Sequence, residues 1–513
     1  MPAGTPSRRT RSRVAVVGGG VAGLAAAYRL AGADDAPDVV VVEGAPRIGG
    51  KLLVSDVAGA PVDAGAESIL NARPEAVNLA RAVGLGGDLV HPETTTAAVW
   101  SRGAVRPMPP TVLGVPADLT ALARSGIVSA RGVGRARMEP LLARLERALA
   151  PVPLANVDLD SVSVATVVGR RLGPEIVDRL VEPLLGGVYA GHADRLSLRA
   201  AAPQIADLVA TGPSLLTAAR ASRQANDARA ADARAAADAR ATDAQAAGDA
   251  QAAGVGEPTP VFAGIRGGVG RLAEAIAAAS GATIRTDSPV RELGRAGDRW
   301  RLVIGSTRDA ETLDVDAVVL ATPAAPTARL LADLAPHLAY ELRRIEYASM
   351  AVVTLAYPRP ERPPDGSGFL VPPIEDRTIK ATTYSATKWS WLAATTDALV
   401  VRASIGRHGE EHVLQRDDCE LVDLAAADLH EAVGLGGPLV DARVTRWGGA
   451  LPQYAVGHRS RVERIRAAIT AMPRLELCGA AYDGVGIAAC VADGTRAGDR
   501  VLAALRAQRT MAP

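Results

Sequence analysis

Three glycines near the start of the chain have the spacing of a dinucleotide-binding loop. Gly18, Gly20 and Gly23 form the pattern G-x-G-x-x-G, and the acidic residue Glu43 follows 20 residues after Gly23. In such a loop Gly18 makes the turn, Gly20 lets the backbone approach a diphosphate, and Gly23 lets a helix pack closely on a strand. Glu43 would accept hydrogen bonds from ribose hydroxyls, and its negative charge disfavours the extra phosphate of NADP.

A βαβ unit has to position these residues. Residues 13–17 (RVAVV) and 38–42 (DVVVV) are β-branched runs that predict two buried parallel strands. The Ala- and Leu-rich residues 24–31 predict the helix between them. A diphosphate would rest on the N-terminus of this helix, where free N–H groups and the helix dipole favour anions.

Two further blocks favour FAD over NAD. The segment R-I-G-G-K ends at Lys51, where paired glycines could wrap the diphosphate and the lysine adds a positive charge, and D-A-G-A-E-S follows at residues 63–68. Near the C-terminus, a glycine loop at residues 479–487 precedes a predicted helix at 488–507, whose N-terminal dipole would stabilise negative charge on a reduced flavin. This order of blocks resembles the superfamily of amine oxidases, phytoene desaturases and protoporphyrinogen-type oxidases.

Longer motifs narrow the resemblance. They are V-E-P-L-L-G-G-V-Y-A-G at residues 181–191, G-F-L-V at 368–371, Arg446-Trp447 with L-P-Q-Y at 451–454, and Y-D-G-V-G-I at 482–487. The chain from about residue 14 to about residue 505 resembles the protoporphyrinogen/coproporphyrinogen oxidase family of FAD proteins, in its bacterial, actinobacterial-type coproporphyrinogen III form. The resemblance implies an α/β fold of the amine-oxidase-like flavoprotein type. Its parts are a Rossmann-like FAD-binding domain, a mixed-sheet substrate domain and a helical subdomain.

The same resemblance implies an activity. It is the oxygen-dependent oxidation of coproporphyrinogen III to coproporphyrin III by non-covalent FAD, with six electrons removed and peroxide formed, in cytoplasmic heme biosynthesis. Partners would be the porphyrinogen, oxygen and other enzymes of the heme pathway, although no residue gives evidence of an enzyme contact. A general base is not identifiable from the sequence.

The family pattern assigns cofactor contacts to particular positions. They are Gly18, Gly19, Gly20, Val21, Ala22, Gly23, Glu43, Gly44, Lys51, Gly65, Ala66, Glu67, Ser68, Val290, Trp447, Val485, Gly486 and Ile487. Residues 65–68 read G-A-E-S where the family has Gly-Pro-Asp-Ser, so this loop lacks a proline and its carboxylate extends one methylene further. Arg73, a few residues later, is expected to hold one substrate propionate.

Alternative functions remain open at this stage. Protoporphyrinogen IX could be the substrate, or the chain could be an amine oxidase, a carotenoid desaturase or a flavin-binding protein without turnover. Aromatic residues make up only 3% of the chain, which counts against the aromatic cage of an amine oxidase. No apolar run is long enough to span a bilayer, which counts against a membrane-attached desaturase.

Composition excludes several other classes. The net charge of +1 gives no sign of a nucleic-acid partner, and the three cysteines have no paired spacing, which indicates a reducing compartment. Positive charge is carried almost wholly by arginine, since lysine occurs only at Lys51, Lys380 and Lys388. Arginines at residues 8–13 precede an apolar run, but the glycine loop inside that run disfavours a signal peptide.

The chain is long enough for about three domains. The predicted FAD-binding domain comprises residues 13–91, 258–325 and 445–510, and the substrate domain 92–112 and 326–444. A helical subdomain is predicted at 113–205, an Ala/Arg/Asp-rich insert at 206–257, and a disordered tail at 1–12. Residues 221–254 lack Leu, Ile and Phe, so they are interpreted as a linker that forms at most a fluctuating helix.

Two other groups of residues are weaker candidates. His408 and His412 would share one face of a helix and could form a zinc pair, but no third ligand is evident, so a solvated surface is favoured and no metal is expected. Cys478 and Cys490 flank the C-terminal glycine loop without CxxC spacing, so we expect them to be buried small residues rather than redox groups.

Overall fold

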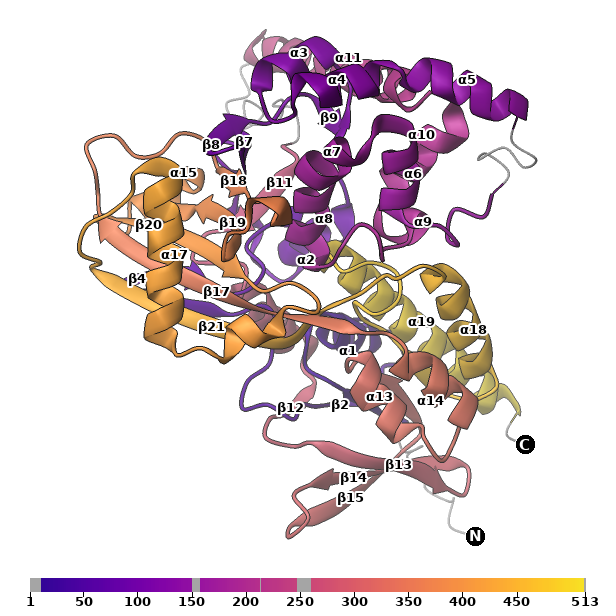
Figure 1. Cartoon of the computed structure of the whole chain (residues 1–513). Helices are drawn as coiled ribbons and strands as arrows, with labels where there is room; N and C mark the ends of the chain where they lie inside the picture. The colour runs from indigo at the N-terminus through magenta and orange to yellow at the C-terminus, as the bar shows by residue number, and fades with distance from the viewer. Residues whose placement is uncertain (1–10, 150–156, 213, 247–259, 512–513) are drawn as a thin grey trace, which may run out of the picture.

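The computed structural model describes residues 11–149, 157–212, 214–246 and 260–511, and they form three parts (Figure 1). A parallel sheet with its helices lies at the bottom, a large mixed sheet at the left, and a group of helices at the top. The predicted α/β class with these three parts is confirmed. Most of the predicted disordered tail, residues 1–10, lies outside the described residues.

The parallel sheet is buried on both faces. Its strand order is β12-β2-β1-β16-β22, with bounds Thr283–Arg285, Asp38–Val42, Arg13–Val17, Ala317–Leu320 and Leu475–Leu477. Val14 and Val16 pack against α1 (Val21–Ala31) and α19 (Ile487–Met511). Ala15 and Val17 pack on the opposite face, towards β13 to β15. Burial on both faces explains why these strands are uninterrupted apolar runs.

The opposite face is covered by a second sheet and three helices. The antiparallel strands are β13 (Val290–Ala296), β14 (Arg299–Gly305) and β15 (Ala310–Val315), and the helices are α13 (Ala324–Leu330), α14 (Pro336–Arg343) and α18 (His458–Thr470). The predicted domain boundary at residue 326 is therefore wrong, because α13 and α14 pack with the parallel sheet.

Strand order reverses between β1 and β16. The chain runs from β1 outward to β2 on one side and returns to place β16 and β22 on the other. Loops that leave the carboxyl ends of β1 and β16 therefore diverge, and α/β proteins bind ligands in the crevice that results.

The mixed sheet has the order β21-β17-β20-β19-β18-β7-β8. Its strands are Asp441–Pro452, Tyr347–Pro358, Ala398–Ile405, Ile379–Tyr384, Gly368–Leu370, Ala97–Ser101 and Ala104–Pro107. Helix α17 (Asp418–Val433) buries Leu421, Ala425 and Leu429 in the core that this sheet forms. The predicted boundary at residue 445 falls inside β21, so residues 445–452 belong to the mixed sheet.

Several short strands and helices complete the fold. The strands are β3 (Val54–Val57), β4 (Ala60–Asp63), β5 (Ile69–Leu70), β6 (Leu89–Val90), β9 (Thr111–Val112), β10 (Val115–Pro116) and β11 (Phe262–Ile265), and the helices are α2 (Pro74–Ala82), α12 (Arg271–Ser280), α15 (Ser385–Lys388) and α16 (Ser390–Ala393).

The third part consists of helices with their own core. They are α3 (Leu119–Ser125), α4 (Ala130–Arg137), α5 (Glu139–Leu149), α6 (Val164–Leu172), α7 (Pro174–Ile176), α8 (Glu182–Tyr189), α9 (Leu198–Ala201), α10 (Pro203–Thr211) and α11 (Leu215–Ala246). A π-helical turn, Val177–Val181, joins α7 to α8.

The predicted insert begins too early. Leu208, Leu215 and Leu216 are buried in the helical core, so residues 206–212 and 214–219 belong to the helical part. The buried carboxylate of Glu139 accepts the backbone N–H of Leu215 at 2.8 Å and thereby caps the start of α11. From Arg220 to Arg229 the helix has no buried residue, as its Ala/Arg/Asp composition predicts. Residues 247–257 of the predicted insert lie outside the described residues.

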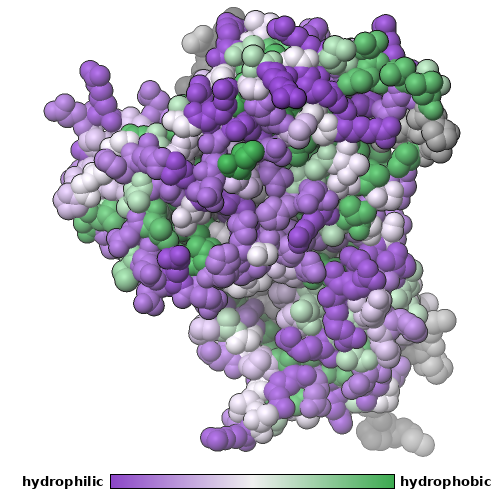
Figure 2. Space-filling view, viewed as in Figure 1, coloured by the Kyte–Doolittle hydropathy of each residue, from purple (hydrophilic) through white to green (hydrophobic). Residues whose placement is uncertain are grey.

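Most of the surface seen in Figure 2 is hydrophilic; hydrophobic residues gather at the upper right over α5, and smaller hydrophobic groups lie elsewhere on this face. Leu141, Leu145 and Leu149 are exposed on that helix. Within the described part of the chain, no helix has the length and apolarity that crossing a membrane requires.

We expect that residues 221–254 can be replaced by a short Gly/Ser bridge without loss of the fold. None of the side chains described in this segment is buried, and the free-energy cost of changing loop length is small. The thermal midpoint should stay within about 3 °C, the shift that about 1 kcal/mol produces in a large domain. A matched deletion that starts at residue 214 removes buried Leu215 and Leu216 and should unfold the helical part. A large drop in the midpoint for the shorter deletion would show that the exposed part of α11 contributes to the fold.

Candidate active site

One large cavity connects the three parts of the molecule. Its volume is about 1410 Å³, above the roughly 300–1,000 Å³ of a site for one drug-sized ligand. The glycine loop after β1 lines one end, β17 to β20 line the other, and Leu184, Gly187 and Val188 of α8 face it from the helical part. The cavity is therefore large enough for a dinucleotide and a second large molecule together.

The glycine loop leaves its backbone open to the cavity. A Cβ at Gly23 would lie 2.0 Å from the carbonyl oxygen of Gly18, so this close approach of α1 to β1 requires glycine. A Cβ at Gly20 would meet nothing within 4 Å and would project into open space. The first turn of α1 has no acidic residue and no side-chain cap, so its N–H groups are free to bind an anion. These features fit the diphosphate of a dinucleotide.

Glu43 lies at the carboxyl end of β2 and lines the cavity. Its Oε2 accepts the N–H of Gly19 at 2.7 Å, and its Oε1 accepts the N–H of Ala45 at 2.8 Å. Each carboxylate oxygen retains a further lone pair for a ribose hydroxyl. Glu43 therefore fixes the glycine loop and also presents an acceptor to the cavity. Gly19 and Gly23 themselves shape the loop and do not line the cavity.

A second loop completes this end of the cavity. The N–H of Gly49 donates to the carbonyl of Gly19 at 2.8 Å, which joins the segment before Lys51 to the glycine loop. A Cβ at Gly65 would lie 2.0 Å from the carbonyl oxygen of Lys51, so the two segments touch only because residue 65 is glycine. Lys51 lines the cavity, and desolvation lowers the pKa of its ammonium group. Within the described residues no carboxylate forms an ion pair with it.

Glu67 and Ser68 do not line the cavity, which differs from their predicted role as cofactor contacts. The Glu67 carboxylate forms ion pairs with Arg402 and with Lys388, and the indole N–H of Trp389 donates to it at 2.6 Å. Burial alone would raise the pKa of Glu67, but Lys388 and Arg402 outweigh it and lower the pKa to about 2. Glu67 is turned towards the mixed sheet because its charge is neutralised there. Ser68 accepts a hydrogen bond from Lys388 at 2.9 Å.

The remaining predicted cofactor contacts line the cavity. They are Gly18, Gly20, Val21, Ala22, Glu43, Gly44, Lys51, Gly65, Ala66, Val290, Trp447, Val485, Gly486 and Ile487. Residues more than 400 positions apart in the chain thus meet at one cavity. Trp447 comes from β21, and its indole N–H donates to the carbonyl of Ala64 at 2.8 Å, which ties the mixed sheet to the second loop.

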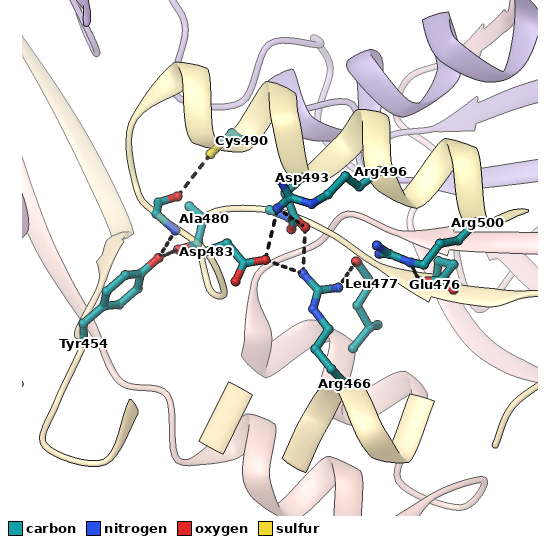
Figure 3. Close-up of polar contacts among 12 residues, drawn as sticks. Tyr454, Arg466, Glu476, Leu477, Ala480, Asp483, Cys490, Asp493, Arg496 and Arg500 are labelled. Carbon is teal, nitrogen blue, oxygen red and sulfur yellow. Dashed lines mark hydrogen bonds and ion pairs between the residues drawn. The ribbon is translucent and has the colours of Figure 1, made fainter. Parts of the chain in front are cut away.

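The C-terminal glycine loop is held by side chains behind it (Figure 3). The Tyr454 hydroxyl accepts the N–H of Gly484 and donates to the carbonyl of Ala480, both at 2.7 Å. Asp493 accepts the N–H of Gly479 at 3.0 Å and is paired with Arg466 at 2.7 Å. These bonds fix the start of α19 against the cavity, where the helix N-terminus can stabilise negative charge.

The two cysteines beside this loop are buried and unpaired, as predicted. Burial raises the pKa of the Cys490 thiol to about 12 and raises that of Cys478 as well. Both groups therefore remain protonated near neutral pH, which disfavours thiolate chemistry.

Cations dominate the charged lining of the cavity. Among the described residues these are Lys51, Arg291, Arg329, Lys380, Lys388 and Arg402, against the single carboxylate of Glu43. All three lysines of the chain are in this set. Lys380, Lys388 and Arg402 were not predicted from the sequence as site residues. The rarity of lysine could have predicted Lys380 and Lys388, because the chain otherwise uses arginine and all three of its lysines line this cavity.

The predicted histidine pair does not share a helix. His408 lies in the loop before the short 3-10 helix Glu411–Gln415, which contains His412, and the carbonyl of His408 accepts a hydrogen bond from the His192 ring at 3.0 Å. Across the described ranges, no group of three or more metal-ligating side chains is assembled.

Arg73 does not line the cavity. It is exposed and immediately precedes α2, near Tyr189 at the end of α8. Burial raises the pKa of the Tyr189 hydroxyl to about 12, and the positive charge of Arg73 opposes this shift. Arg73 therefore lies close to the helix that borders the cavity, on the solvent side.

Comparison with known proteins identifies the family. The sequence pattern described as flavin containing amine oxidoreductase matches residues 21–502. The chain belongs to this family. It is 35% identical over 502 residues to a protein from Mycobacterium tuberculosis named coproporphyrinogen III oxidase, with 96% of this chain and 98% of that protein covered. A Bacillus subtilis protein of the same name is 28% identical, with 95% and 97% covered.

A solved structure is also similar to this chain over its whole length. The chain is similar to a protein from Exiguobacterium, provisionally titled protoporphyrinogen oxidase, with a TM-score of 0.79, 27% identity and coverage of 98% of this chain and all of that one. The resemblance to porphyrinogen oxidases that the sequence motifs predict is confirmed. Members of this family contain a flavin, and the residues that line the cavity fit a flavin site.

Replacing Glu43 with lysine should abolish flavin retention. The change removes the acceptor for the Gly19 N–H and places a cation beside the ribose position. We expect the purified variant to be colourless, as measured by flavin absorbance per protein chain. Asp38→Lys makes the same charge change at the exposed amino end of the same strand and should retain flavin. A Glu43→Lys protein that stays yellow at wild-type stoichiometry would refute the role assigned to Glu43.

Proposed function

We propose that this protein is an oxygen-dependent FAD oxidase that converts coproporphyrinogen III to coproporphyrin III in heme biosynthesis. The observation that carries the proposal is full-length similarity to proteins of that name, combined with a cavity that joins a dinucleotide loop to a cationic substrate sheet. The physiological setting would be the cytoplasm, with oxygen as acceptor and other heme-pathway enzymes as contacts. Protoporphyrinogen IX is the alternative substrate, because the similar Exiguobacterium protein is titled for it.

FAD fits the described residues as a non-covalent cofactor. The glycine loop and the first turn of α1 would hold its diphosphate, Glu43 its ribose, and the backbone at Val290 its adenine. Trp447 and residues 485–487 would border the flavin ring. Cys490 lines the cavity, but its raised pKa leaves little thiolate for attachment. When bound, FAD would supply the chemistry that accepts hydride from a meso carbon and passes the electrons to oxygen.

The protein's own contribution is position and charge. The walls from β17 to β20 and from α8 form one continuous cavity with the flavin end, so a flat macrocycle can lie beside the cofactor. Cationic lining residues match a substrate that carries four carboxylates. The start of α19, held by Tyr454 and Asp493, offers a fixed positive dipole to negative charge that develops at the flavin end.

Anaerobic mixing tests the proposal directly. Coproporphyrinogen III should bleach the flavin absorption, and admission of oxygen should restore it with release of coproporphyrin III and peroxide. We expect a higher kcat/KM for coproporphyrinogen III than for protoporphyrinogen IX, because the latter has vinyl groups in place of two of the four propionates. A higher kcat/KM for protoporphyrinogen IX would identify that compound as the substrate. If the flavin stays oxidised with both compounds, the protein binds flavin but lacks this activity.

We also propose that Arg73 binds one propionate at the rim of the cavity. Loss of one charged hydrogen bond costs about 1.5–3 kcal/mol, so Arg73→Ala should lower kcat/KM for coproporphyrinogen roughly tenfold or more. The effect on protoporphyrinogen should be smaller if the vinyl compound lacks this propionate. Arg81→Ala removes an exposed arginine from α2, the helix that follows Arg73, and should have no effect. Equal kcat/KM values for the two variants would remove Arg73 from the site and leave the activity proposal unchanged.

A further inference from the structure

A buried lysine faces the substrate end of the cavity. Lys380 lies on β19, is only 2% exposed, and lines the cavity. Its Nζ lies 3.8 Å from the sulfur of Met350, which also lines the cavity. Met350 is paired across the sheet with Trp447, on the flavin side. Lys380 therefore lies in the mixed sheet close to the region where substrate and flavin would meet.

A β-bulge accounts for its position. On β20, Ile405 pairs with Ile379 and Ser404 with Ala381, so Lys380 is the extra residue of the strand. A bulge changes the direction of a side chain and is frequent beside active sites. β17 has a second irregularity between Ala348 and Met350, so both residues of the Lys380–Met350 contact lie at or beside irregular points in the sheet.

No carboxylate of the described residues compensates the Lys380 ammonium. Charged side chains close to β19 in the fold have other partners. Glu182 of α8 binds the His192 ring and the N–H of Ala193, and Asp428 of α17 accepts the N–H of Ile379. Arg402 and Lys388 pair with Glu67, and Arg407 pairs with Glu410 and donates to the carbonyl of Val371. The Lys380 contact with a thioether replaces little of the hydration that the cation loses.

Burial, together with the nearby positive charge of Arg407, lowers the pKa of Lys380 to about 7. An unpaired buried cation is costly, and an arriving anion would offset that cost and raise the pKa again. A lysine suits this position better than an arginine, because lysine can lose its proton in the free protein and regain it with the ligand.

We propose that Lys380 is the inner binding residue for one carboxylate of the porphyrinogen substrate. The inference rests on the proposed function, which supplies a substrate with propionates. Its evidence is independent of the sequence motifs: a buried ammonium without a carboxylate partner, placed by a bulge, at the wall of a cavity whose charged lining is almost wholly cationic. Arg73 would then act at the rim and Lys380 inside.

The test compares Lys380→Met with Lys380→Arg in flavin-loaded protein. Binding of coproporphyrin III, a stable tetracarboxylate, is measured by fluorescence titration, with flavin content and thermal midpoint as checks of the fold. Lys380→Met should weaken coproporphyrin binding and raise KM for coproporphyrinogen by about tenfold or more, with kcat within roughly threefold. Lys380→Arg should recover most of the affinity. Removal of an unpaired buried charge is not expected to destabilise the fold.

The affinity of the wild-type protein for coproporphyrin III, measured as a function of pH, gives a second test that does not depend on an inactive variant. The free pKa is about 7 and the bound pKa is higher, so wild-type affinity should be constant below pH 7 and fall as pH rises above it. Both variants should lack this decline, because neither has a group at residue 380 that titrates there. If Lys380 had only a structural role, replacing it would not change how the affinity for coproporphyrin depends on pH.

Several outcomes would overturn the inference. Unchanged coproporphyrin affinity in Lys380→Met, whether or not kcat falls, excludes carboxylate binding, and a fall in kcat alone would assign proton transfer instead. If wild-type protein oxidises coproporphyrinogen while Lys380→Met binds coproporphyrin equally well, only this inference fails. If wild-type protein neither binds coproporphyrin nor oxidises coproporphyrinogen, the proposed function fails and the inference with it.

Discussion

The carboxylate of Glu67 joins the second loop at the cavity to the mixed-sheet part of the molecule. It follows the second loop of the dinucleotide end, yet its partners Lys388, Trp389 and Arg402 all belong to the mixed-sheet part. Arg402 also donates to the carbonyl of Gly65 at 2.6 Å. The cluster therefore holds the second loop against the mixed sheet beside the cavity, which Gly65 and Arg402 both line. Removing the Glu67 carboxylate would leave Lys388 and Arg402 without their shared partner, and breaking such an ion pair inside a protein typically costs about 3–5 kcal/mol.

The sequence predicted well whatever depends on neighbours along the chain. The strand, glycine turn and helix from residue 13 to residue 31 and the acid at residue 43 are local, and the structure places them as expected. The C-terminal loop and α19 were predicted for the same reason. Hydrophobic runs buried on both faces and turns that require glycine are strong signals, because few other structures tolerate them.

Contacts between distant segments were less predictable. Glu67 looked like a cofactor residue because it sits in a flavin-loop motif, and nothing in the local sequence shows that Arg402, 335 positions later, neutralises it. The predicted domain boundaries were wrong where a strand or helix packs in a different part of the molecule from the segments next to it in the chain, as β21 and α13 do. Lys380 could not be placed at all, because the bulge that positions it depends on the pairing of β19 with β20.

The confinement of lysine to the cavity has a chemical consequence. Reagents that acylate primary amines react with the neutral amine, and all three lysine side chains of this protein border the cavity. An ordinary lysine is almost wholly protonated at pH 7, whereas burial lowers the pKa of Lys380 to about 7, so its neutral form is far more abundant there. Acylation of lysine, which usually labels a protein's surface, would therefore modify this protein inside its cavity. A bound ligand that protects one lysine from the reagent would show which end of the cavity the ligand occupies.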